Sequence, residues 1–198
     1  MTSIALALRK SSIGGRLLPA AAAFFLLQTS PAWGQPAPGS LSVQEERGVY
    51  TVLARFAVDQ PGSVALAVLT DYEQIPRFMP GVLSSTVLER SAGRAMVEQE
   101  AVSTVMVFSR RVHLVLEIDE GPDALVFRDR CGRSFVRYEG AWRVSPDGGR
   151  TTITYELTAE PSFDVPGFML KRVMRRDSAQ MIERLQREIA ARATSDPR

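Results

Sequence analysis

The sequence predicts an α+β fold, in which a curved, seven-stranded antiparallel sheet wraps around one long C-terminal helix. Two patterns indicate this fold. Between residues 82 and 159, apolar and polar side chains alternate in runs separated by short turns, which is typical of consecutive antiparallel strands. From residue 168 to residue 192, apolar residues recur every three or four positions, with no Pro or Gly. A sheet of this size must cover one apolar face, and only this helix is long enough to do so.

Length and charge suit one domain with a short N-terminal extension. The chain has 198 residues, an apolar fraction of 45% and a formal net charge of +2. Residues 1–34 contain Arg9, Lys10 and Arg16 and no acidic residue, so the remainder carries a net charge of −1. A nearly neutral domain has no electrostatic basis for binding nucleic acid or an anionic membrane. We therefore expect no nucleic-acid partner.

The first 34 residues have the pattern of a secretory signal peptide. A basic start is followed by a short apolar core at residues 17–27, and residues 32–34 (Ala-Trp-Gly) place small residues before Gln35. The apolar core is shorter than the about 20 residues that span a bilayer. We expect export across the inner membrane and a periplasmic location. An uncleaved N-terminal anchor is the alternative.

The rest of the chain divides into three parts. Residues 35–47 are rich in Pro, Gly and Ser and lack periodicity, which predicts a flexible linker. Residues 48–193 are predicted to form the folded domain, and residues 194–198 a disordered tail. Cys131 is the only cysteine, so no intramolecular disulfide stabilises the domain.

The elements of the domain follow in order. Residues 49–58 are rich in β-branched and aromatic side chains and predict the first strand. Pro61 suits the first turn of a helix that ends near residue 70. Residues 71–80 contain two prolines, which exclude a regular helix and favour one or two bent helical turns. Six further strands are predicted around residues 82–89, 94–104, 112–118, 125–127, 136–144 and 153–159.

Three segments together carry a family resemblance. Residues 69–80 (LTDYEQIPRFMP) contain D-Y-x-x-x-P-x-aromatic-x-P, residues 139–143 (EGAWR) contain G-x-W, and an uninterrupted helix closes the chain. Over about residues 48–192, the chain resembles the START-like (SRPBCC) helix-grip superfamily, which includes polyketide cyclases/dehydrases, lipid-transport proteins and coenzyme Q-binding proteins. The resemblance implies a β-α-α-β6-α fold around an apolar cavity. It does not imply one activity, because such proteins range from carriers to cyclases.

Ten residues are candidates for binding a ligand in this cavity. Most fall on the predicted inner faces of the sheet and the helix, where they either line a lipophilic pocket or fill a closed core. Phe78 and Met79 lie between prolines at the expected mouth, where they gate a ligand, touch a membrane transiently or cap the fold. Asp177 interrupts the apolar face of the helix and contacts either a ligand or an arginine such as Arg176 or Arg184. The candidates are Phe78, Met79, Leu116, Phe127, Tyr138, Trp142, Tyr155, Met174, Asp177 and Met181.

Catalytic and metal chemistry have little support in the sequence. His113 is the only histidine and falls on the polar side of its strand, which argues against a catalytic triad or a histidine metal site. Cys131 has no evident partner that would activate its thiol. We expect no metal, no cofactor and no catalytic residue. Acid–base chemistry by Tyr138 or Asp129 is the alternative.

The sequence therefore indicates an exported binding or carrier protein for a hydrophobic small molecule, such as a quinone, an isoprenoid, a fatty acyl or a polyketide-like compound. Ligand access is expected near residues 78–82. A cyclase or dehydratase that uses the same cavity is one alternative. A non-catalytic interaction domain with a filled core is another.

Overall fold

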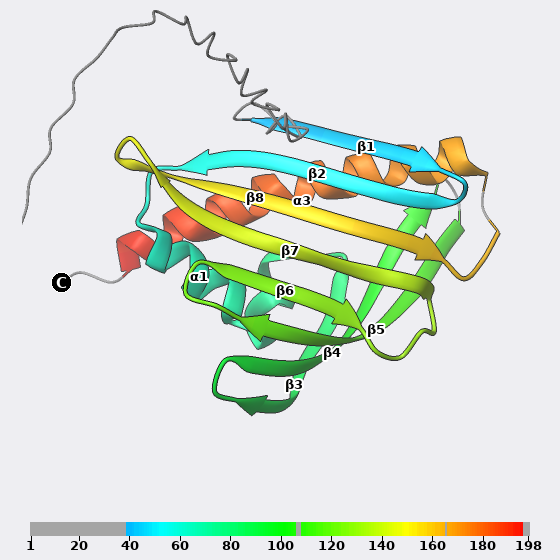
Figure 1. The fold of residues 1–198 in the computed structure, drawn as a ribbon, viewed down its shortest axis with the longest axis horizontal. Helices are drawn as coiled ribbons and strands as arrows, with labels where there is room; N and C mark the ends of the chain where they lie inside the picture. The colour runs from blue at the N-terminus through cyan, green and yellow to red at the C-terminus, as the bar shows by residue number, and fades with distance from the viewer. Residues whose placement is uncertain (1–38, 106–107, 165, 196–198) are drawn as a thin grey trace, which may run out of the picture. The chain divides into compact units, whose positions relative to one another are not determined.

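The computed structural model describes residues 39–105, 108–164 and 166–195, and the signal-peptide prediction for residues 1–34 lies outside them. The order of elements is a strand pair, short helices, six strands and a long helix (Figure 1). The elements are β1 (Ser40–Glu46), β2 (Val49–Val58), α1 (Gly62–Thr70), η1 (Tyr72–Gln74), α2 (Ile75–Phe78), β3 (Val82–Ser91), β4 (Arg94–Val105), β5 (Phe108–Glu120), β6 (Ala124–Asp129), β7 (Phe135–Asp147), β8 (Arg150–Pro161) and α3 (Gly167–Ser195).

The predicted fold class is confirmed, with one strand more than expected. A single antiparallel sheet has the strand order β1-β2-β8-β7-β6-β5-β4-β3. The extra strand, β1, occupies residues 40–46, which the sequence assigned to a linker. Its apolar alternation consists only of Leu41 and Val43, too short a pattern to stand out from the neighbouring Pro and Gly residues. Val43 pairs with Val52 of β2 and is buried, so β1 extends the sheet at an edge.

The two ends of the predicted strand series pair with each other. From β3 to β8, consecutive strands are neighbours, as the alternating pattern predicts. The strand β2, in contrast, pairs with β8, where Val52 lies opposite Leu157. The short helices α1, η1 and α2 connect β2 to β3, which forms the other edge of the sheet (Figure 1).

The helix α3 packs against one face of the sheet. Val173, Leu185 and Ile189 are buried on its inner side, and α3 contacts α1, β1, β2 and β4. The helix continues to Ser195, so residues 194 and 195 are helical, although the sequence placed them in a disordered tail. None of the helices in the described segments is both long and apolar enough to cross a membrane.

Asp71 forms an ion pair that connects the segment of short helices to the end of α3. It lies between α1 and η1, but its side chain caps neither helix, contrary to what its position suggests. One carboxylate oxygen accepts a hydrogen bond from the Arg192 guanidinium at 2.6 Å. Arg192 also donates to Glu188 at 2.8 Å, so three side chains form one ion-pair group.

Candidate functional site: a cavity between the sheet and α3

A cavity of about 1070 Å³ lies between the sheet and α3. Ligand sites usually have volumes of roughly 300–1,000 Å³, so this cavity has room for a lipid-sized molecule. All ten residues predicted to line a lipophilic pocket lie along it, and their role in binding a ligand stays a prediction. They are Phe78, Met79, Leu116, Phe127, Tyr138, Trp142, Tyr155, Met174, Asp177 and Met181.

Aromatic side chains from β6, β7 and β8 form a continuous wall of the cavity. The ring of Trp142 lies 4.3 Å from that of Tyr155, measured between centroids. Phe127 lies 6.4 Å from Tyr155 and 6.0 Å from Tyr138, and Phe135 continues the series 4.8 Å from Tyr138. Tyr138 and Trp142 face the cavity together because side chains of a strand point to the same side at every second position.

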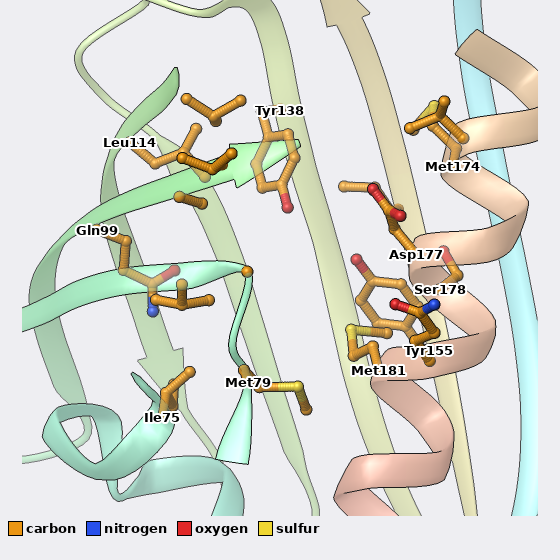
Figure 2. A pocket seen from close by; sticks show the side chains of 18 of the residues that line it. Ile75, Met79, Gln99, Leu114, Tyr138, Tyr155, Met174, Asp177, Ser178 and Met181 are labelled. Atoms are coloured by element: carbon orange, nitrogen blue, oxygen red, sulfur yellow. The ribbon is translucent and has the colours of Figure 1, made fainter. Parts of the chain in front are cut away.

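Two phenol groups supply polar atoms within this wall. The hydroxyls of Tyr138 and Tyr155 point into the space between the sheet and α3 (Figure 2). Burial raises the pKa of both phenols, and the neighbouring Tyr138 raises that of Tyr155 further. Both groups therefore stay neutral at physiological pH. A neutral phenol can donate a hydrogen bond to an uncharged oxygen of a ligand or accept one from it.

The helix α3 forms the opposite wall of the cavity. Met174, Asp177, Ser178 and Met181 project from it toward the cavity (Figure 2). Ser178 is buried, whereas the Asp177 side chain is 41% exposed and accepts a hydrogen bond from Nη2 of Arg176 at 2.7 Å. Asp177 thus lines the cavity and also pairs with Arg176, one of the two arginines named as its partners; its contact with a ligand stays a prediction.

Part of the cavity lining is exposed to solvent. Phe78 and Met79 are half-buried in its lining, and the adjacent Gly81 is exposed, at the position where ligand access is expected. Arg110 is an exposed part of the same lining, and its guanidinium carbon lies 3.6 Å from the centroid of the Phe163 ring.

Several lining residues were missed by the sequence reasoning. Three of them could have been found from the apolar pattern. Leu114 lies two positions before the predicted Leu116, and Leu170 and Val173 lie on the apolar stripe of α3. Gln99 and Phe163 had no such signal. Gln99 is a polar residue inside an apolar wall, where its amide donates to Ser85 Oγ at 3.1 Å, and Phe163 lies between β8 and α3.

Of the residues considered for acid–base or metal chemistry, Tyr138 lines the cavity, whereas Asp129, His113 and Cys131 do not. Asp129 does not line the cavity; its carboxylate accepts hydrogen bonds from the backbone amides of Val115, Cys131 and Gly132. His113 Nδ1 lies 2.7 Å from a carboxylate oxygen of Glu100. Over the described part of the chain, no group of three or more His, Cys, Asp or Glu residues is placed to hold a metal ion.

Comparison with known proteins identifies the family. Residues 58–186 match the family model described as polyketide cyclase/dehydrase and lipid transport, and the chain belongs to this family. The family supports a site that binds a hydrophobic ligand or a cyclase-type role. No curated protein sequence matches the chain.

Solved structures share the fold at low sequence identity. The Zhui aromatase/cyclase from Streptomyces sp. R1128 has a TM-score of 0.63 and 18% identity, covering 73% of this chain and 96% of its own. A START superfamily protein from Mycobacterium smegmatis has a TM-score of 0.62 and 17% identity, covering 71% and 97%. A STAR-related lipid transfer protein from Xanthomonas axonopodis has a TM-score of 0.54 and 16% identity, covering 76% and 98%.

Proposed function

We propose that the protein is an exported binding or carrier protein for a hydrophobic small molecule, held in the cavity between the sheet and α3. The observation that carries the proposal is the size of this cavity, about 1070 Å³, together with its apolar and aromatic lining. Transfer of a ligand from water into such a site gains ~25 cal/mol for each Å² of apolar surface buried. The lipid-transfer relative of the same fold is consistent with this use.

A ligand with an apolar body and an uncharged oxygen fits the lining best. The aromatic wall and the methionines of α3 contact apolar surface, and methionine adapts to irregular shapes. Tyr138 and Tyr155 offer neutral hydrogen-bonding groups, and the carboxylate of Asp177 is paired with Arg176. Quinones, isoprenoid alcohols, fatty acyl esters and polyketide-like ketones meet these requirements.

Export is a separate part of the proposal and rests on the composition of residues 1–34. The measurement is the N-terminal mass of the protein recovered from separated cell fractions. Processed protein that begins at Gln35 in the periplasmic fraction supports export. Full-length protein confined to the cytoplasm contradicts it and leaves the ligand proposal standing.

The ligand proposal is tested by native mass spectrometry and organic extraction of the full chain purified from its own cells. The variant Met174→Trp adds a large ring to the cavity, and Ala179→Trp adds the same ring on the exposed side of α3. We expect a lipophilic compound in the wild type and in Ala179→Trp, and its loss in Met174→Trp. A protein that is empty and also fails to bind quinones, fatty acids and isoprenoids contradicts the proposal.

A cyclase or dehydratase is the second candidate, and the neutral phenols in the cavity favour it. A phenol directed at a ligand carbonyl can donate a hydrogen bond as negative charge develops on the oxygen. The test is turnover of a polyketide-like ketone by Tyr138→Phe and Tyr155→Phe; unchanged turnover in both contradicts this function. The interaction-domain alternative required a filled core, which the cavity argues against.

A further inference from the structure

The outward face of the first turns of α3 carries an exposed aromatic ring and three cations. Phe168, Lys171, Arg172 and Arg175 follow the spacing i, i+3, i+4 and i+7, which places them on one face of the helix. All four are exposed, and Phe168 reaches 78% exposure, the highest value among the exposed large hydrophobic residues of the described chain. We refer to these four residues as the α3 strip.

Although residues 35–198 together carry a net charge of only −1, the positive charge of the α3 strip is not balanced locally. Within the described segments, Lys171, Arg172 and Arg175 form no ion pair with a carboxylate. Asp177, the acidic residue nearest to them on the helix, is held by Arg176. In the second half of α3, two cations have carboxylate partners: the exposed Arg187 pairs with Glu183 at 2.9 Å, and the half-buried Arg192 pairs with Glu188 at 2.8 Å.

This arrangement weakens the helix in isolation. Lys171 and Arg175 are like charges four residues apart, which repel each other on a helix surface. The first turn of α3 itself contains no acidic residue, although the Glu45 carboxylate of β1 lies beside Gly167 at the start of the helix. The repulsion between the cations is relieved when a negatively charged surface lies against the strip, so the strip is better suited to an anionic partner than to open solvent.

We propose that the α3 strip docks the protein on an anionic lipid membrane. The cations would lie at the level of the lipid phosphates, and the Phe168 ring would enter the interfacial region, as in helices that bind along membrane surfaces. An exposed aromatic ring at the end of a basic strip favours a lipid surface over an acidic protein. Phe78 and Met79, the residues first considered for membrane contact, are half-buried and offer less apolar surface.

The opposite face of the same helical turns lines the cavity. Met169, Leu170, Val173 and Met174 belong to the cavity lining. Docking through the strip would therefore hold the cavity beside the bilayer, separated from it by the width of one helix. The docking itself does not depend on which ligand the cavity binds.

Co-sedimentation of the full chain with lipid vesicles tests the proposal. One vesicle type contains phosphatidylcholine alone, and the other contains one-third phosphatidylglycerol. We expect tighter binding to the anionic vesicles, weakened by salt. The variant with Lys171→Gln, Arg172→Gln and Arg175→Gln should lose about a hundredfold in affinity, since each basic residue near the surface contributes roughly fivefold. Phe168→Ala should lose about tenfold, because it removes one buried aromatic ring.

Matched controls separate the strip from net charge and hydrophobicity. The variant with Arg128→Gln, Arg143→Gln and Arg150→Gln makes the same change in charge on exposed sheet residues, and Leu88→Ala removes another exposed apolar side chain. Both should bind like the wild type. Residues 1–34 are the same in every sample, so a difference in binding between a variant and the wild type is due to the substituted residues.

Three outcomes would overturn the proposal. The first is equal wild-type binding to the two vesicle types, and the second is undiminished binding of the triple α3 variant to anionic vesicles. The third is no binding to either vesicle, which would leave an acidic protein as the partner to search for. Circular dichroism of each variant establishes that any loss of binding does not come from an unfolded helix.

Discussion

The ring of Phe127 lies over Gly140, its cross-strand partner between β6 and β7. A Cβ atom at Gly140 would stand 2.7 Å from Cζ of Phe127 and 2.0 Å from the backbone oxygen of Glu156. Real atoms do not approach so closely, so the ring can occupy this position only above a glycine. The glycine of the G-x-W segment therefore lets Phe127 join the aromatic wall of the cavity.

Replacing Gly140 with alanine should destabilise the fold. The added methyl group overpacks a site closed by backbone atoms, which typically costs about 1–3 kcal/mol. Urea denaturation of Gly140→Ala measures the effect. Gly81→Ala is the control, because the nearest atom to its added Cβ is a backbone oxygen at 3.5 Å, an ordinary contact. Equal free energies of unfolding for the two variants would contradict this account.

The ion pair between Asp71 and Arg192 should contribute to stability more than a fully exposed pair. Its side chains are 37% and 29% exposed, and it joins the short helices to the end of α3. We expect Arg192→Gln to lower the free energy of unfolding by about 1 kcal/mol, and less in high salt. Arg187→Gln, which breaks a pair with 65% and 68% exposed side chains, should change it little. Equal effects would show that the link to Asp71 adds nothing.

Removing the phenol hydroxyls should weaken binding of ligands that carry an oxygen, and leave pure hydrocarbons unaffected. A net hydrogen bond is worth about 0.5–1.5 kcal/mol, which corresponds to a loss of roughly two- to tenfold in affinity. Titration of Tyr138→Phe and Tyr155→Phe with a long-chain ketone and with the corresponding alkane measures both effects. Equal losses for ketone and alkane would indicate damage to the cavity instead of a lost hydrogen bond.

Stability should fall in alkaline solution because of the buried phenols. Burial raises the pKa of Tyr138 and Tyr155 above the unfolded value of 10.0. Above that pH the unfolded state loses these protons first, so their contribution is complete below pH 10 and decreases as pH rises toward the folded values. Thermal unfolding as a function of pH should show a shallower alkaline decline in the variant with Tyr138→Phe and Tyr155→Phe. If the stability of the variant falls as steeply as that of the wild type, other groups cause the alkaline loss of stability.

The alternation and spacing of apolar residues in the sequence predicted the strands β2 to β8 and the helix α3. Tyr138 and Trp142 alternate on β7, and Met174 and Met181 repeat along α3; all four line the cavity. These residues could be found because burial of one face imposes a local repeat. The same repeat describes a filled core, so it could not reveal the cavity, whose volume depends on the spacing of the helix and the sheet.

Features made by distant parts of the chain left no local pattern. The contact between Asp71 and Arg192 depends on the folded path of the chain, and a single aspartate next to a helix more often indicates a cap. The strand β1 has only two inward apolar residues, and it is held by pairing with β2. The α3 strip was likewise hidden, because a basic, exposed helix face is common in sequence and only the missing ion pairs distinguish it.

The pairing of β2 with β8 also has a consequence for the time course of folding. Tyr50 pairs with Ala159, so β1 and β2 cannot join the rest of the sheet until almost the whole domain has been synthesised. Proteins whose contacts join distant residues fold slowly, because the loop must close before the contact is gained. If residues 1–34 direct export, as proposed, this delay keeps the nascent chain unfolded while it is threaded through a translocation channel. The pairing of β2 with β8 would then delay folding until export, in addition to joining the two parts of the sheet.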